Sequence, residues 1–223
     1  MLLSALAACS HLIRSLRVQE TIFGAKTPRT QPRLGRHSHW VLDGYDPAHV
    51  SEDGVALSIK KKNIVRLDTL IASGTYEILF KLEHDIIDSG VCGFGLVKHD
   101  LDLLALSREF STDVKVTHEN LWHENLWWLR RFHCMVYSGT SCEGGEGAFS
   151  TTEFPVGATV RIVVDMEKGE ATFFVNDTKL KHKAKNITGP VYPCALSYRS
   201  FKEGGFLQNY VKISIVHVKR TSK

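Results

Sequence analysis

Apolar and polar residues alternate with a period of two along much of the chain after Val55. In residues 76–82 every second side chain is apolar, and the positions between them are mixed. Because successive side chains of a strand point to opposite faces of a sheet, this run predicts a strand with one buried face. Comparable short runs, separated by Gly, Asn, Asp or Pro, occur at residues 55–59, 91–97, 160–164, 172–175, 191–198 and 211–215. Helical periodicity is scarce, so the pattern predicts an all-β sandwich or barrel.

One β-hairpin is specified within residues 160–176. Its strands, VRIVVD and ATFFVND, are separated by the segment MEKGE. Gly169 in that segment can adopt the positive φ angle that closes a short loop between antiparallel strands. A second turn is expected at Asn176-Asp177.

The alternation is interrupted between about His99 and Arg131. This stretch begins with LDLLALSREF, which is compatible with a short helix, and continues with polar and aromatic residues. We interpret it as a long inserted loop, and long loops on a rigid sandwich often carry function.

Basic charge is concentrated at the start of the chain. The net charge of the 223 residues is +4, yet residues 1–37 alone hold six Lys and Arg against one acid. Residues 38–218 hold 19 basic residues against 23 acids, so the body is mildly acidic and polyanion binding by it is not expected. We predict a poorly ordered or helical leader and linker at 1–37, a single domain at 38–218 and a basic tail at 219–223.

The leader and the cysteines bear on the compartment. Apolar residues near the start recur at roughly helical spacing, with arginines and almost no acids, as in a mitochondrial transit peptide; an added or frayed terminus is the alternative. The five cysteines form no CxxC pair, which argues against a zinc ribbon or an extracellular disulfide framework. We therefore predict a reducing compartment, the cytoplasm, with the mitochondrion as the alternative.

Four segments, taken in order, resemble the SPRY domain family. Ser73–Ile78 is similar to an early strand of the family, and Gly93–Leu96 is similar to the glycine-rich strand that follows it. Val160–Asn176 resembles a hairpin in which an apolar strand ends in Asp, a Gly forms the turn and a Phe-rich strand ends in Asn. Gly189–Ser197 resembles a late strand with an aromatic-Pro pair. The resemblance spans about residues 40–218.

This resemblance implies a bent antiparallel β-sandwich of the concanavalin-like, jelly-roll type that acts as a protein-interaction module. Asp177 stands where the family usually has a turn Gly, and two segments lack a Trp that the family often carries. Each departure is a turn or packing substitution, so the expected fold stands. The family binds its ligands through variable loops, so the identity of a ligand does not carry over.

A perfect tandem pentapeptide, His118–Trp122 followed by His123–Trp127, lies in the predicted loop and continues into Trp128–Arg131. Its histidines are five positions apart, or about 140° around a helix, whereas two zinc ligands on one helix face need a spacing of about four. We therefore predict no metal site. Two interpretations remain: a contact loop, since Trp and Arg dominate binding hot spots, or a small satellite core under the insertion.

Four lysines alternate with other residues in the segment KLKHKAK, residues 179–185. An extended backbone would place them along one face as an anion-binding stripe. Single-stranded nucleic acid would also need stacking aromatic residues between them, and the segment has only His182. We favour an edge strand whose lysines discourage pairing with another chain.

The common enzymatic signatures are missing. The chain has no GxxxxGK[ST], no GxGxxG after a strand and no GxSxG. We predict a non-catalytic module without a cofactor that binds a protein or a short peptide through its loops, with no nucleic-acid partner and no membrane span. A glycan-binding domain of the same fold is the alternative, followed by an enzyme on the same scaffold.

The candidate contact residues are aromatic and arginine side chains in predicted loops or at strand ends. They are Tyr45, Trp122, Trp127, Trp128, Arg130, Arg131, Tyr198 and Arg199.

Overall fold

The computed structural model describes residues 38–43, 48–59, 63–85, 92–106, 123–131, 134–143, 154–197 and 210–221. These residues all belong to one unit, residues 36–223. The predicted leader, residues 1–37, lies outside the described residues.

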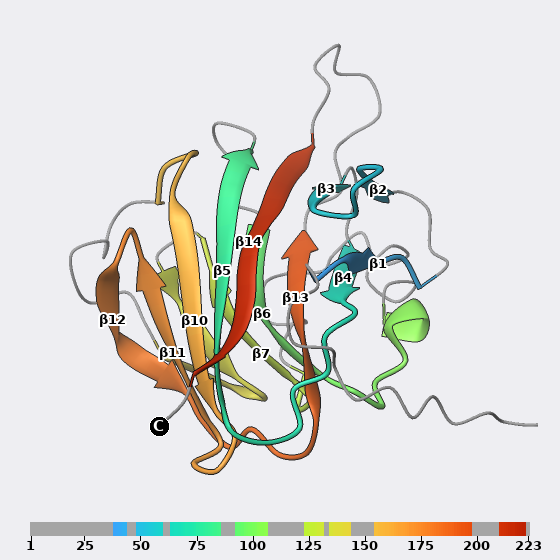
Figure 1. Cartoon of the computed structure of the whole chain (residues 1–223). Helices are drawn as coiled ribbons and strands as arrows, with labels where there is room; N and C mark the ends of the chain where they lie inside the picture. The colour runs from blue at the N-terminus through green and yellow to red at the C-terminus, as the bar shows by residue number, and fades with distance from the viewer. Residues whose placement is uncertain are drawn as a thin grey trace, which may run out of the picture. The chain divides into compact units, whose positions relative to one another are not determined.

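Two antiparallel sheets, each with seven strands among the described residues, form a sandwich (Figure 1). Sheet A has the order β1 (Trp40–Val41), β4 (Asn63–Leu67), β13 (Val191–Ser197), β6 (Cys92–Lys98), β7 (Leu126–Arg130), β8 (Val136–Ser138) and β9 (Ser141–Glu143). Sheet B has the order β12 (Thr178–Ala184), β11 (Glu170–Val175), β10 (Thr159–Asp165), β5 (Thr75–His84), β14 (Val211–Thr221), β3 (Ala56–Ile59) and β2 (Ala48–Val50). The predicted all-β antiparallel sandwich is confirmed.

Sheet B follows the alternation seen in the sequence. Along β5, β10 and β11 every second side chain is buried against sheet A, and the positions between them face outward and are only partly buried. The predicted hairpin is formed by β10 and β11, and its turn contains Gly169 with a φ of 63°. The second turn, at Asn176 and Asp177, leads into β12 with positive φ at both residues, as a tight two-residue hairpin turn requires. β12 is an edge strand, as its lysines suggested.

Aromatic rings run through the main core between the two sheets. Trp40 stacks on Phe80 at 5.7 Å between ring centroids, Phe80 contacts Phe94 at 5.6 Å, and Phe94 contacts Phe154 at 6.1 Å. Offset or tilted ring pairs at these distances add to the stabilisation that burial provides. The indole N–H of Trp40 donates to the carbonyl of Val55 at 2.9 Å, so the polar atom of this buried ring is satisfied.

A second hydrophobic cluster covers the face of sheet A that points away from sheet B. It combines outward-facing side chains of β4, β6, β7, β8 and β13 with Leu103 and Leu106 of a helical turn at residues 103–106. Its centre is Trp128, which stacks on Tyr137 with ring centroids 4.3 Å apart and planes 7° apart. A Cβ atom at Gly93 or Gly95 would collide with Trp128, so the two glycines of β6 make room for this ring.

The prediction of a long loop between His99 and Arg131 is wrong for its last part. Its end forms strand β7, which lies between β6 and β8 inside sheet A. The sequence did not reveal this strand because it is buried on both faces and so reads as a continuous apolar run. The structure also differs at the carboxyl end, where β14 runs to Thr221 and so includes Lys219 and Arg220 of the predicted tail.

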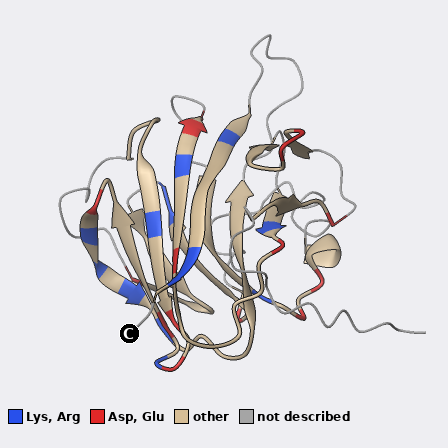
Figure 2. Cartoon of the chain, in the orientation of Figure 1, with Lys and Arg blue, Asp and Glu red and all other residues tan. Residues whose placement is uncertain are grey.

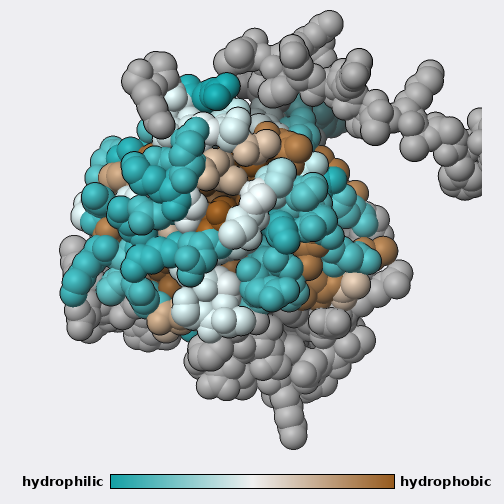
Figure 3. All heavy atoms as spheres, turned by 90° about the horizontal axis from the view of Figure 1, so that it is seen from below, coloured by the Kyte–Doolittle hydropathy of each residue, from teal (hydrophilic) through white to brown (hydrophobic). Residues whose placement is uncertain are grey.

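The face of the molecule seen in Figure 3 is mainly polar. Figure 3 shows hydrophilic residues over most of the visible described surface, with hydrophobic residues in small separate groups. In the part of the chain that the structure describes, no helix is long and apolar enough to cross a membrane.

We predict that Gly95→Ala destabilises the fold by about 3 kcal/mol, because its Cβ would meet the Trp127 carbonyl and the Trp128 side chain. Gly157→Ala is the comparison. It carries a positive φ of 90° but has open space around the added Cβ, so only the dihedral penalty of about 1 kcal/mol is expected. Equilibrium denaturation measures the free energy of unfolding of both variants. Equal losses of stability would show that the contact of the added Cβ with Trp127 and Trp128 does not destabilise the fold.

Candidate functional site

The register of sheet A brings the ends of four strands, β4, β6, β7 and β13, to one end of the sandwich. Ser197, at the end of β13, pairs with Asn63 at the start of β4 and with Cys92 at the start of β6. Gly93 pairs with Arg130, so β7 also finishes there. We call this end, marked by residues Asn63, Asp85, Arg131 and Ser197, the polar end. These are four of the five buried polar or charged residues in the described part of the chain.

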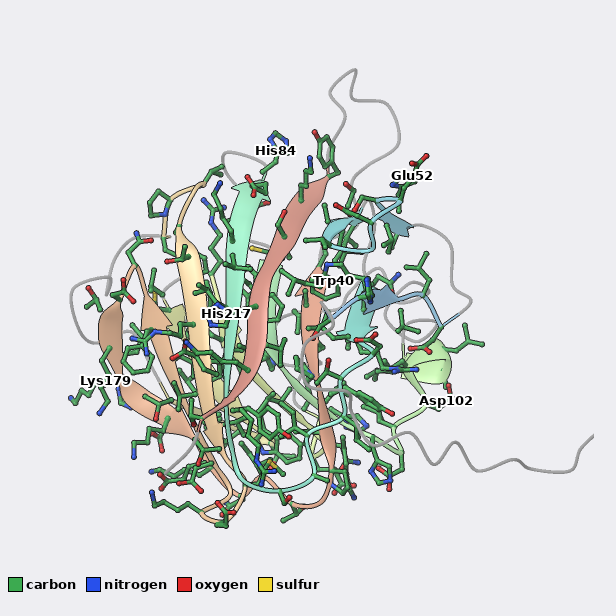
Figure 4. All side chains as sticks on the ribbon, viewed as in Figure 1. Trp40, Glu52, His84, Asp102, Lys179 and His217 are labelled. Carbon is green, nitrogen blue, oxygen red and sulfur yellow. The ribbon has the colours of Figure 1, made fainter. Side chains whose placement is uncertain are left out.

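A buried ion pair joins three segments at the polar end. The Arg131 guanidinium donates to the Asp85 carboxylate at 2.6 Å and, through Nε, to the carbonyl of Phe154 at 2.8 Å. The two charged side chains are 6% and 0% exposed. The pair therefore ties the end of β5 to the end of β7 and to the segment before β10. Nearby, His84 (labelled in Figure 4) stacks on Tyr210 at 4.5 Å, which ties the end of β5 to the start of β14.

Three of the sequence-predicted contact residues are buried. Trp127 belongs to the main core between the sheets, and Trp128 lies in the second cluster on the outer face of sheet A. Arg131 is occupied by its interactions inside the polar end. The two Trp side chains thus pack as core residues, which is the packing alternative raised by their sequence.

Of the remaining predicted residues, the structure describes only Arg130. Arg130 is partly exposed at the end of β7. Tyr45, Trp122, Tyr198 and Arg199 lie outside the described residues. Tyr198 and Arg199 come directly after β13 in the sequence, and β13 finishes at the polar end.

A pocket of about 280 Å³ lies at the opposite end of sheet A from Ser197. Its walls come from the end of β1, from β4 and β13, and from the turn after β6. Polar side chains dominate the lining, with leucines of residues 101–104 beside them; the polar residues are Asp43, Arg66, Lys98, His99, Asp102 and Tyr192. We call this the Arg66 pocket.

Arg66 is held in a fixed position on the pocket wall. Its Nε and one terminal nitrogen donate to the two carboxylate oxygens of Asp43, at 2.9 Å each. The guanidinium also lies over the ring of Tyr192, with Cζ 4.4 Å from the ring centroid. A bidentate ion pair combined with a cation–π contact orients a guanidinium strongly, so the site is pre-organised.

The other polar groups place donors and acceptors around the same pocket. Asp102 accepts a hydrogen bond from the backbone N–H of Ala105 at 2.9 Å, which caps the helical turn. Lys98 lies 3.7 Å from Asp100, a longer contact that leaves its ammonium accessible to a ligand. Figure 4 shows Asp102 beside the helical turn, on the far side of the molecule from Lys179. Arg66 and Lys98 balance Asp43 and Asp102, so the pocket offers both signs of charge.

Metal ligands and reactive thiols are two kinds of group that could support chemistry among the described residues. The described residues contain no group of three or more His, Cys, Asp or Glu placed to hold a metal ion. Burial raises the pKa of the Cys134 thiol to about 11 and also raises the pKa of Cys194, so both stay protonated and weakly nucleophilic near neutral pH.

The sequence reasoning missed the Arg66 pocket. The sequence indicates Tyr192 only as the aromatic residue of an aromatic-Pro pair. Arg66 lies in β4, a short strand that the sequence pattern does not predict. Asp43 and Arg66 are 23 positions apart, and only the antiparallel pairing of β1 with β4 brings them together. An Arg within an otherwise apolar strand was the one available signal.

Comparison with solved structures identifies the fold. The chain is similar to the SPRY domain of human HERC1, with a TM-score of 0.53 and 20% identity over 77% of this chain and 96% of that one. It is also similar to the TRIM65 PSpry domain, with a TM-score of 0.53 and 10% identity over 82% of this chain and 93% of that one. No family model matches the sequence, and no curated protein matches it. The fold is therefore SPRY-like, as the sequence resemblance implied.

We predict that breaking the buried ion pair at the polar end destabilises the protein strongly. Asp85→Ala or Arg131→Ala should each cost about 3–5 kcal/mol, because the remaining charge is buried without its partner. The double variant should cost less than the sum of the two, and a denaturant double-mutant cycle measures this coupling. Additive losses would show that the two side chains do not depend on each other.

Proposed function

Because the chain has a SPRY-like fold, we propose that it is a non-catalytic protein-recognition module that binds a short peptide or a partner domain. The Arg66 pocket is the observation that carries this proposal. Arginine and aromatic side chains supply most of the binding energy in protein interfaces, and here one of each is held rigidly at a concave site. A pre-organised site loses little conformational entropy on binding.

The size of the pocket supports a peptide ligand. Its volume of about 280 Å³ is at the lower limit of the roughly 300–1,000 Å³ common for small-molecule sites. Such a space suits one or two side chains of a partner better than a large cofactor. The guanidinium and ammonium groups would bind acceptors of the ligand, and the leucines of residues 101–104 would contact its apolar atoms.

The predicted loop residues extend this proposal. Tyr45 follows Asp43 of the pocket by two positions in the sequence, so we propose that it adds an aromatic contact to the pocket. Trp122 is proposed as a contact of the segment that precedes β7, and Arg130, Tyr198 and Arg199 as contacts at the polar end. The proposed compartment remains the cytoplasm, supported by the free thiols of the described cysteines.

We predict that Arg66→Ala and Tyr192→Ala each weaken partner binding at least tenfold, because each removes half of the stacked pair. Partners are first captured from cell extract with the unaltered chain and identified by mass spectrometry, and the purified partner is then titrated calorimetrically against each variant. Lys168→Ala is the control, since Lys168 is an exposed cation in the β10–β11 turn, outside the pocket. Unchanged affinity in both pocket variants, with melting temperatures preserved, would contradict the assignment of the pocket.

A glycan ligand is the second candidate. A lectin is the alternative suggested by the sequence, and the pocket places Asp, His and Arg side chains next to an aromatic ring. The stacking of Arg66 on Tyr192 occupies one face of that ring, which favours the peptide. Binding on a glycan array that Tyr192→Ala abolishes, without any peptide or protein partner dependent on Arg66, would favour the glycan.

A further inference from the structure

The outer face of sheet B carries two ordered rows of side chains that run across five strands. The register from β14 through β5, β10 and β11 to β12 defines the first row as His217, Leu79, Arg161, Phe174 and Lys179. The neighbouring row is Lys219, Glu77, Val163, Thr172 and Lys183. It lies two residues away along every strand except β12, where the β-bulge makes the shift four residues. We call these ten residues the two-row surface.

Lysines occupy three of the four row ends, His217 occupies the fourth, and Arg161 lies at the centre of the first row. Four Lys and Arg face one Glu within the two rows. Figure 2 shows Lys and Arg on β12, β10, β5 and β14 across this face, and Figure 4 shows Lys179 on β12 and His217 on β14. Two flanking acids pair with members of the rows: Glu170 lies 3.0 Å from Lys183, and Asp177 lies 3.5 Å from Arg161.

Three of these cationic side chains converge on a single carboxylate. Glu77 receives Lys219 at 2.8 Å and His217 at 2.9 Å, and Arg161 lies 3.6 Å away. The hydrogen bond from Lys219 lowers the pKa of Glu77, against a smaller opposing effect of burial, and His217 and Arg161 lower it further. One carboxylate therefore shares two Lys or Arg charges and a histidine, and the cluster attracts additional negative charge.

Apolar groups lie between the cations. Leu79, Val163 and Phe174 are partly exposed on the outer face of the sheet. The guanidinium of Arg161 lies 3.7 Å from the centroid of the Phe174 ring, and Phe174 pairs with Lys179 on the next strand. The aromatic neighbour that the lysine segment lacked in the sequence is thus supplied by the adjacent strand.

The spacing of the cations matches a helical partner. Strands lie about 4.8 Å apart, so Lys179 on β12, Arg161 on β10 and Lys219 on β14, on every second strand, are about 10 Å apart in the direction across the sheet. Two turns of an α-helix advance about 10.8 Å, so acids at every second turn would meet successive cations. Apolar side chains between those acids would contact Leu79 and Phe174.

We propose that the two-row surface binds an acidic amphipathic helix of a partner protein, laid across the strands of sheet B. This surface lies on the opposite sheet from the Arg66 pocket and is independent of it. Nucleic acid fits less well, because its phosphates form a dense line of negative charge that would pass over Glu77. A protein helix can place its acids over the cations and leave Glu77 unopposed.

The test uses a synthetic helical peptide with glutamates at every second turn and leucines between them. A second peptide with glutamine in place of glutamate serves as the control ligand. We expect the full chain to bind the glutamate peptide at least tenfold more tightly than the glutamine peptide, as measured by fluorescence anisotropy, and to lose affinity as salt is raised. Equal affinity for the two peptides would overturn the proposal.

Variants locate the binding on the two-row surface. Arg161→Glu should lower the affinity for the glutamate peptide at least tenfold. Glu77→Gln should raise this affinity several-fold, because it frees the cations that converge on Glu77. Lys168→Glu makes the same charge change as Arg161→Glu outside the rows and should have little effect. Lys179→Glu, at an exposed side chain, replaces Arg161→Glu if that variant fails to fold.

Two outcomes would contradict the proposal directly. An equal loss of peptide affinity in Lys168→Glu and Arg161→Glu would indicate non-specific attraction by net charge. Tighter binding of oligothymidylate than of the glutamate peptide, abolished by Arg161→Glu, would assign the surface to single-stranded nucleic acid instead. Arg66→Ala should leave peptide binding unchanged, so failure here is distinguishable from failure of the Arg66 pocket.

Discussion

The central strands of sheet A are buried on both faces, and the position of the Arg66 pocket depends on this constraint. All six residues Cys92–Val97 of β6 are buried, one face against sheet B and the other under the second cluster. Trp128 fills that second layer, and Gly93 and Gly95 are needed because any larger side chain would displace its ring. A sheet covered on both sides leaves room for a ligand only where the cover ends, and the Arg66 pocket lies at such a place.

Within the part of the chain that the structure describes, sheet B is covered on its inner face, and its outward-facing side chains in β5, β10 and β11 are partly exposed. The same alternation that buries Ile78 and Phe80 turns Glu77 and Leu79 outward. Antiparallel register then aligns outward residues of different strands into rows. The two proposed surfaces thus lie on different sheets and share no residue.

The polar end has a different role. Buried polar groups need hydrogen-bonding partners. Asp85 and Arg131 pair with each other, and this pair links the end of β5 to the end of β7. A rigid base of this kind allows the loops that leave it to vary without loss of the fold. Arg131 illustrates why residue type alone misleads: an arginine near a loop is equally suited to binding a partner and to neutralising a buried carboxylate.

Local sequence by itself determined the central strands of sheet B, β5, β10 and β11, because one buried face imposes a period of two. It also determined the β10–β11 hairpin through Gly169. The resemblance of four segments to SPRY domains was sufficient to predict the fold. Only the tertiary structure decided that Leu126–Arg130 is a strand, since burial on both faces removes the alternation. It alone brought Arg66 to Tyr192 and His217 to Glu77, because the pairing of strands far apart in the chain leaves no periodic signal in the sequence.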